Sequence, residues 1–214
     1  MSENIDRPNR RQLDKDMNRQ VLLEATARVI LEYGAGGATI SRIQAESGLS
    51  RGMINLHFQS KDNLIRELAH YLGERYDKLW QTFADGSSPN VTTPEEAAAR
   101  MRSLFETDLS PEVLDEQIAR LTVSFRAEPQ LQDLAPSFLE TRNTVLHNYV
   151  RRCCEVLCQA CRPQSDPEKI AMAFMSLLEG LWIDFQQHPH DFDRNYAIDI
   201  CLTTANAFFP DYFE

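Results

Sequence analysis

The sequence lacks any apolar run near the about 20 residues needed to span a bilayer. Its first residues, MSENIDRPNRRQ, are polar, and we expect no signal peptide. Cysteine is scarce: the five cysteines are an odd number in 214 residues, which argues against a disulfide framework and favours a reducing, cytoplasmic location. No alternation of apolar and polar residues persists, so an extended sheet is excluded. What is left is an all-α chain.

Motifs of the common enzyme classes are also missing. There is no glycine-rich phosphate loop after a strand, no nucleophile elbow and no metalloprotease histidine pair. His147, Cys154, Cys158 and Cys161 share one helical face, but that face extends about 21 Å, too far for one metal ion. Cysteines that pack as small apolar side chains are the better interpretation. We therefore expect no enzyme, no metal site and no cofactor.

Positive charge is in deficit overall, and the formal net charge is −10. Residues 1–66 hold ten of the 22 Lys and Arg residues and eight of the 32 Asp and Glu residues, a balance of +2, so the remaining residues carry −12. Arg7, Arg10, Arg11, Lys15 and Arg19 lie close together in the sequence, and we expect residues 1–16 to act as a basic arm. This asymmetry suits a protein that presents only its N-terminal part to phosphates, although ordinary scatter of surface charge is an equal alternative.

Helical periodicity is present throughout the chain. The apolar positions of the first helix recur on one face from Leu22 to Tyr33, and Gly34 follows where a helix end favours a left-handed residue. ADGSSPNVTTP at 84–94 is the clearest loop, and Thr93-Pro94 starts another helix. The prediction is an all-α fold of about nine helices. It has an N-terminal three-helix domain at 17–77, preceded by the arm at 1–16, and a C-terminal helical domain at 78–214.

The segment 39–65 predicts a helix-turn-helix. A short helix ends at the turn Gly48-Leu49-Ser50, a second short helix begins at Arg51, and a longer helix begins at Ser60-Lys61. In such a unit the second helix enters the major groove of double-stranded DNA. Ile54 and Phe58, four residues apart, are expected to pack against the preceding helices.

The same residues resemble the DNA-binding domain of the tetracycline-repressor (TetR) family of bacterial transcription regulators, from about Met17 to Leu68. The matching features are Tyr33-Gly34, the entry at 38–40, the turn at 45–50, and then Gly52-Met53-Ile54, His57-Phe58 and Ser60-Lys61. The sequence Gly-Met-Ile-x-x-His-Phe, with LEGLW at 178–182, resembles the branch that contains the choline-sensing repressor of betaine synthesis (BetI-like). The resemblance implies a dimeric repressor that a ligand releases from DNA. In such a protein, residues 17–77 are expected to form the helix-turn-helix DNA-binding domain, and residues 78–214 the ligand-binding and dimerisation domain.

Several side chains of this segment are candidates for DNA contact. Arg51 can bind a guanine edge or a phosphate, and Asn55, where the family usually has a tyrosine, can pair with adenine. Met53 and Leu56 can touch thymine methyl groups, whereas His57 and Lys61 are placed for phosphates. The complete predicted set is Thr39, Ser41, Arg42, Ser50, Arg51, Gly52, Met53, Asn55, Leu56, His57 and Lys61.

The helix around 170–185 is apolar on nearly every side, so it must be covered on more than one side. One side can face its own domain and the other a second copy, and palindromic DNA half-sites about 34–36 Å apart require such a homodimer. The predicted interface is Phe174, Leu177, Leu181, Ala197, Ile200, Cys201, Thr204 and Phe208. The alternative is a monomer whose core encloses this helix.

Aromatic residues of the C-terminal part predict a small-molecule pocket, with ordinary core packing as the alternative. Aromatic faces beside an acid such as Glu179 or Glu106 can hold a quaternary ammonium by cation–π attraction of about 0.5–2 kcal/mol per face. The candidate residues are Phe105, Phe125, Tyr149, Leu178, Glu179, Trp182 and Phe185.

The function expected from these features is a sequence-specific, ligand-released dimeric repressor, with choline or another quaternary ammonium as the inducer that the resemblance implies. A ligand-dependent activator, a sensor of a different small molecule and a helical interaction protein that does not bind DNA are the alternatives.

Overall fold

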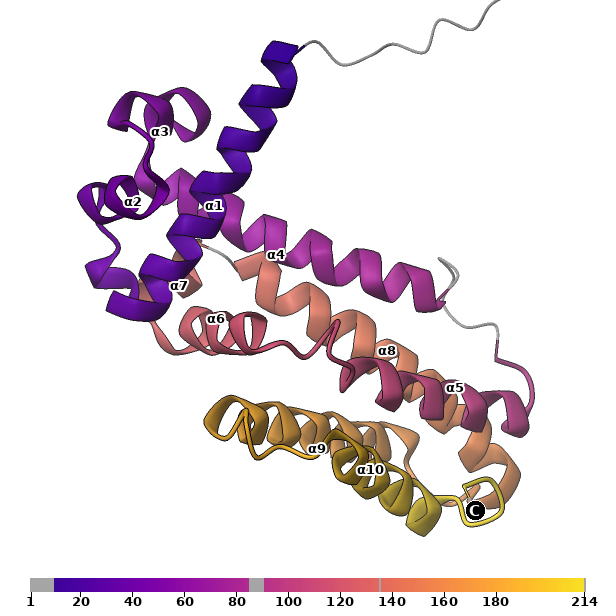
Figure 1. Cartoon of the computed structure of the whole chain (residues 1–214). Helices are drawn as coiled ribbons and strands as arrows, with labels where there is room; N and C mark the ends of the chain where they lie inside the picture. Colours follow the sequence, from indigo (N-terminus) through magenta and orange to yellow (C-terminus); the bar gives the residue numbers. More distant parts are fainter. Residues whose placement is uncertain (1–9, 85–90, 135, 214) are drawn as a thin grey trace, which may run out of the picture. The chain divides into compact units, whose positions relative to one another are not determined.

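The computed structural model describes residues 10–84, 91–134 and 136–213, and these ranges hold helices and no strand (Figure 1). The all-α prediction is confirmed. The described ranges contain ten helices, close to the predicted number of about nine. The helices are α1 (Arg10–Gly37), α2 (Ile40–Ser47), α3 (Arg51–Phe58), α4 (Lys61–Ala84), α5 (Pro94–Asp108), α6 (Glu116–Ala127), α7 (Pro129–Leu134), α8 (Pro136–Cys161), α9 (Pro167–Gln187) and α10 (Arg194–Phe208).

Helix boundaries follow the local signals of the sequence. The predicted starts at Arg51, Lys61 and Pro94 are confirmed. Gly34 has the left-handed φ of 70° and breaks α1 where the prediction ended the first helix. Of the predicted basic arm, residues 1–9 lie outside the described residues, whereas the chain from Arg10 onward is already helical.

The chain divides into two compact units. Unit 1 consists of the residues up to Tyr71 together with Val123–Pro136, and unit 2 consists of Leu72–Thr122 and Ser137–Glu214. The predicted boundary at 77/78 therefore lies a few residues beyond the end of the first segment of unit 1. The inclusion of the end of α6 and of α7 in unit 1 was not predicted, because nothing in their local pattern connects them with α1.

The core of unit 1 forms where α1, α2 and α3 pack against one another. Ile43 of α2 and both Ile54 and Phe58 of α3 have no exposed surface, and Val29 of α1 is 2% exposed. This agrees with the expected packing of α3 on the earlier helices. An eight-residue helix is too short to be stable alone, so burial of its apolar face holds α3 in place.

The core of unit 2 is built from α5, α8, α9 and α10, with α9 and α10 in contact with each other (Figure 1). Phe105, Phe174 and Phe209 are fully buried in it. The Phe105 and Phe174 ring centroids lie 5.6 Å apart, within the range in which aromatic pairs stabilise a core. Among the described residues no helix is both long enough and apolar enough to cross a membrane.

We expect Ile54→Ala to lower the free energy of unfolding of unit 1 by about 2–5 kcal/mol, because it leaves a cavity under α3. Leu56→Ala is the matched control: it lies two residues away on the same helix but is 67% exposed, and it should change stability by less than about 0.5 kcal/mol. Urea denaturation followed by circular dichroism measures both. Equal effects of the two substitutions would contradict the orientation of α3.

Candidate nucleic-acid interface

Capping side chains at the starts of α2 and α3 position the helix-turn-helix. The Thr39 hydroxyl accepts the Arg42 N–H at 3.3 Å and begins α2, and the Ser50 hydroxyl accepts the Met53 N–H at 3.4 Å and begins α3. Between them Gly48 has φ 70° and donates its N–H to Gln44 O at 2.9 Å. A left-handed residue at this helix end favours glycine, so the turn is encoded locally.

The outward face of α3 carries the side chains expected to meet DNA. Arg51, Asn55 and Leu56 are exposed, and Met53 is half-buried. Arg51 and Asn55 lie one helical turn apart on the same face. Among the residues that the structure describes, Arg51 takes part in no ion pair, so its guanidinium is available to a phosphate or a base edge.

His57 does not lie as predicted. Its ring is half-buried, with both ring nitrogens covered and without a hydrogen-bond partner among the described residues. Burial, followed by the nearby charges of Lys15 and Arg19 on α1, lowers the pKa of His57. A ring packed beside Phe58 with both nitrogens covered is poorly suited to a phosphate, so the predicted phosphate contact of His57 does not fit the structure.

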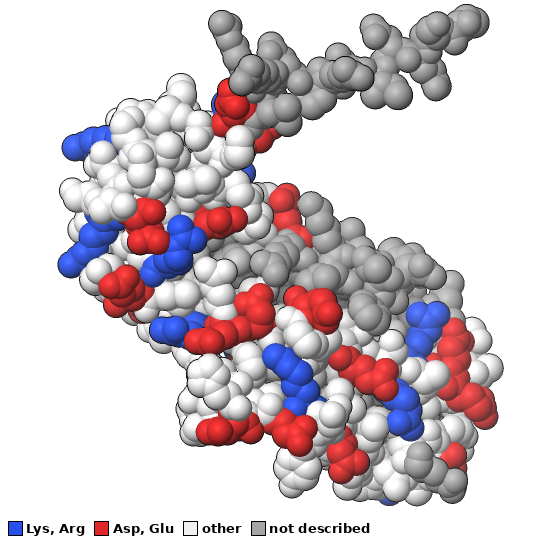
Figure 2. All heavy atoms as spheres, in the orientation of Figure 1, with Lys and Arg blue, Asp and Glu red and all other residues white. Residues whose placement is uncertain are grey.

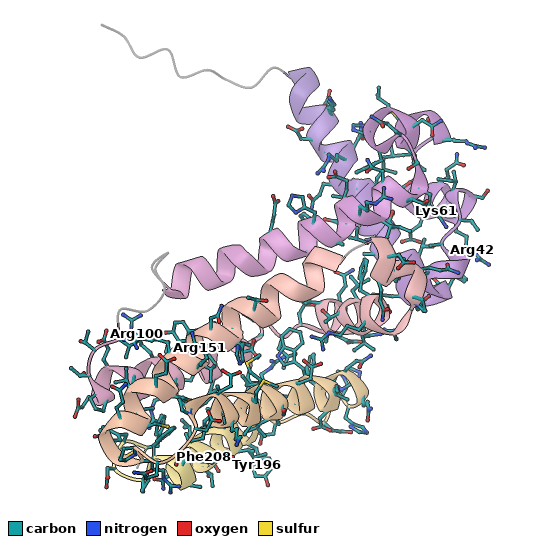
Figure 3. All side chains as sticks on the ribbon, turned by 180° about the vertical axis from the view of Figure 1, so that it is seen from behind. Arg42, Lys61, Arg100, Arg151, Tyr196 and Phe208 are labelled. Atoms are coloured by element: carbon teal, nitrogen blue, oxygen red, sulfur yellow. The ribbon has the colours of Figure 1, made fainter. Side chains whose placement is uncertain are left out.

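Arg42 on α2 and Lys61 at the start of α4 are two further cations of this unit, and both are labelled in Figure 3. Arg42 is exposed, its guanidinium lies 4.1 Å from the centroid of the Tyr33 ring, and its Nη1 donates to Gly37 O at 2.7 Å. Lys61 is half-buried at the start of α4, where the Ser60 hydroxyl accepts the Asn63 N–H at 3.1 Å. The exposed Thr39 and Ser41 stand beside Arg42 at the start of α2. A helix N-terminus and two cations form a surface that suits phosphates.

Charges on unit 2 are of mixed sign. On the face drawn in Figure 2, acidic side chains are spread among the basic ones, and no continuous basic surface covers this unit. Several of its arginines are paired with acids on their own helix, including Arg100 with Glu96 and Arg152 with Glu155. This agrees with the acidic balance of residues 67–214 and leaves unit 1 as the part suited to phosphates.

Most of the predicted ligand residues lie in the core of unit 2. Phe105, Leu178, Trp182 and Phe185 are buried, and Tyr149 and Glu179 are half-buried. Phe125 is also buried, but it belongs to the segment of unit 1.

The buried acid of unit 2 is Asp108, which the sequence analysis missed. Its carboxylate has no exposed surface and accepts the Trp182 indole N–H at 2.9 Å, whereas the predicted Glu106 is exposed. Asp108 follows Leu104 by four residues, on the apolar face of α5. An acid on an otherwise apolar face is the sequence signal that could have indicated a buried carboxylate. Arg194 was also missed: it donates to Leu109 O and Leu114 O, both at 2.7 Å, and lies over the Phe185 ring.

The predicted dimer residues fall into two groups. Phe174, Leu181, Ala197 and Cys201 are buried in the protomer, each with 9% or less of its surface exposed, and offer little to a second copy. The apolar stripe that they form is the core-facing side of α9 and α10. Helical periodicity of apolar residues alone does not distinguish such a side from a dimer interface. The half-buried members are Leu177, Ile200, Thr204 and Phe208.

Four of the five cysteines are buried in the protein, and Cys161 is half-buried. Burial raises the pKa of Cys153 and of Cys201 to about 12, so both thiols stay protonated near neutral pH. The described residues contain no cluster of three or more His, Cys, Asp or Glu side chains that could hold a metal ion.

Comparison with known proteins is consistent with this geometry. Residues 22–68 match the model of bacterial regulatory proteins of the tetR family, and residues 97–210 match that of the C-terminal part of BetI-type transcriptional repressors. The HTH-type transcriptional regulator BetI of Yersinia pestis (strain Pestoides F) is 25% identical over 186 residues, which cover 85% of this chain and 87% of that protein.

Solved structures show the same fold. A transcriptional regulator from Pseudomonas aeruginosa PAO1 has a TM-score of 0.71 at 22% identity, covering 93% of this chain and 95% of that one. NalD, the secondary repressor of the MexAB-OprM multidrug efflux pump in Pseudomonas aeruginosa, has a TM-score of 0.60 at 22% identity, covering 89% and 94%. Each of these proteins is described as a transcriptional regulator or repressor.

Proposed function

Because this chain belongs to the TetR family of bacterial regulatory proteins, with a C-terminal region of the BetI repressor type, we propose that it is a dimeric repressor that a small molecule releases from DNA. The chain is a DNA-binding transcriptional regulator. The proposal assigns its DNA-reading residues, its dimer surface and its class of effector. It also places the protein in the cytoplasm.

The exposed face of α3 is the part that reads the operator. Arg51 supplies a fork of donors for a guanine edge or a phosphate, and Asn55 supplies a donor and an acceptor for adenine. Leu56, with 67% of its surface exposed, offers an apolar contact to a thymine methyl group. An exposed leucine between polar residues has no structural role in the protomer, and this observation favours base reading most. Arg42, Lys61 and the hydroxyls of Thr39, Ser41 and Ser50 are assigned to the phosphate backbone, where Gly52 allows close approach.

We expect Arg51→Glu and Lys61→Glu to abolish sequence-specific binding, because each replaces an attraction to DNA by a repulsion. The operator is first selected from a random-sequence duplex library by the wild-type chain, and affinities are then measured by gel shift at fixed salt. Arg120→Glu on α6 is the matched control, since its side chain is exposed outside the proposed DNA-binding and dimer surfaces and the change also replaces a positive by a negative charge. If the charge-reversed variants bound the selected duplex like the control, the DNA-binding assignment would be wrong.

A second copy of the chain is assigned to the exposed side of α9. Met172 and Ile183 on this helix are 50% and 41% exposed, and Tyr196 of α10 is 65% exposed. Between the two α9 residues lie the small residues Ala173, Ser176 and Gly180, all exposed, which let another helix approach closely. The half-buried Leu177, Ile200, Thr204 and Phe208 extend the surface; Tyr196 and Phe208 are labelled on α10 in Figure 3. Two-fold pairing would place two copies of α3 on successive half-sites.

We expect Gly180→Arg to convert the dimer into a folded monomer. A Cβ added at Gly180 meets nothing within 4 Å, so the protomer tolerates the change, whereas the paired helix does not. Analytical ultracentrifugation measures the mass, and Gln159→Arg on the exposed side of α8 serves as the control. A Gly180→Arg variant that stays dimeric would place the interface elsewhere.

The proposed effector is an organic cation bound in unit 2. The Asp108 carboxylate supplies negative charge beside the Trp182 indole, and Phe105 and Phe185 supply further aromatic faces. Aromatic faces with a carboxylate attract a quaternary ammonium, and choline is the representative suggested by the resemblance to BetI-type repressors. Binding is proposed to tilt α4, displace α3 from the half-site spacing and weaken operator binding by about 1–3 kcal/mol.

We expect choline at 100 times its Kd to stabilise the protein by about 2.7 kcal/mol. Its uncharged isostere 3,3-dimethyl-1-butanol should not, because it lacks the positive charge. Asp108→Asn keeps an acceptor for Trp182 and removes the charge, so the choline response should be lost with the fold intact. Thermal denaturation measures the stabilisation, and titration in the presence of operator should show reciprocal antagonism. Equal stabilisation by both compounds would rule out a cation site.

A further inference from the structure

The turn between α1 and α2 is held by a side chain from a distant part of the sequence. Glu128 follows the last residue of α6, and its Oε2 accepts the Ala35 N–H at 2.8 Å. A Cβ built on Gly34 would lie 3.7 Å from both carboxylate oxygens, so the carboxylate lies directly over the turn. This hydrogen bond joins residues 93 positions apart, both within unit 1.

The backbone of Glu128 is fixed where it enters the contact. Its N–H donates to Ser124 O at 3.1 Å, and its carbonyl accepts the N–H groups of Leu131 at 2.9 Å and Gln132 at 3.1 Å. Phe125 and Leu131, on either side of it, have no exposed surface. The carboxylate is thus presented by an anchored junction of α6 and α7, and α7 lies beside the end of α1 (Figure 1).

The turn that Glu128 holds determines how α2 begins. Ala35 O accepts the Ala38 N–H at 3.2 Å, and Gly37 O accepts both the Thr39 N–H at 2.9 Å and the Arg42 guanidinium. Thr39 is the cap of α2, and Arg42 is a proposed phosphate contact. A shift of this turn therefore moves residues of the DNA-binding surface without any direct contact of Glu128 with DNA.

We propose that Glu128 is a positioning residue for operator binding, acting through the hydrogen bond from Ala35 N–H to its carboxylate. The inference rests on the proposed function, since it assumes that α2 and α3 bind an operator. It extends that function because Glu128 lies at the end of α6, a helix that begins in unit 2 and ends in unit 1. α6 provides a second covalent route, besides α4, by which a change in unit 2 reaches the DNA-binding surface.

Three substitutions separate the hydrogen bond from the charge. Glu128→Ala removes both, and Glu128→Gln removes the charge but keeps an oxygen acceptor. Asp133→Ala removes one exposed carboxylate from α7 in the same segment and serves as the charge-matched control. Each is compared for affinity to the duplex selected by the wild-type chain, and for hydrogen exchange of the Ala35 amide followed by NMR.

Glu128→Ala should bind the selected duplex about three- to tenfold more weakly than Asp133→Ala, and its Ala35 amide should exchange about tenfold faster. Glu128→Gln should match Asp133→Ala in both measurements. Thermal unfolding is recorded for every variant, and a loss of affinity is counted only for protein that is folded at the assay temperature.

Three results would overturn the proposal: equal affinity of Glu128→Ala and Asp133→Ala, failure of Glu128→Gln to restore affinity, or faster Ala35 exchange with unchanged affinity. If the wild-type chain selects no duplex, the proposed function itself fails and the positioning role falls with it. Ala35 exchange, which needs no DNA, would then still report whether the hydrogen bond exists.

Discussion

Burial of one face of α3 is the constraint on which the DNA-binding surface depends. The helix has eight residues, too few to persist alone, and only two of them, Ile54 and Phe58, are fully buried. Because they are four residues apart, they turn Arg51, Asn55 and Leu56 outward at once. Gly48 and the Ser50 cap then set where the helix begins. The side chains that α3 exposes are therefore determined by the two that it buries.

Burial also determines which side of α9 stays exposed, but here more than one side of the helix is apolar. Its core face takes Phe174, Leu178 and Trp182. Its other side keeps Met172 and Ile183 exposed around small residues, which is an unusual surface for a protomer that acts alone. The position of a residue around the helix axis, rather than its apolar character, therefore separates the core side of α9 from the proposed interface.

Asp108 is an unusual residue of the unit 2 core. Its carboxylate is buried beside the Trp182 indole, at a position where most domains would place an apolar side chain.

Charge is divided in a way that suits one-sided contact with DNA. The excess of acids lies in residues 67–214, where arginines such as Arg100 and Arg152 are paired with neighbouring acids. Unit 1 keeps Arg51 free of ion pairs among its described residues and orients Arg42 by stacking it on Tyr33. An acidic chain can bind a polyanion when its few uncompensated cations face the phosphates and its excess acids are displayed elsewhere.

Local pattern determined the all-α class, the starts of α3, α4 and α5, the left-handed breaks at Gly34 and Gly48, and which side of α3 is buried. These properties depend on neighbours within one or two helical turns, which the sequence displays directly. Only the tertiary structure decided the environment of His57, the burial of Asp108 against Trp182, the core position of Phe174 and Cys201, and the contact of Glu128 with Ala35. Each of these depends on residues distant along the chain, and a periodic stripe gives no indication of which partner will cover it. The physical reason is that the helical periodicity of apolar residues identifies the face of a helix that is buried, whereas tertiary packing determines which residues contact that face.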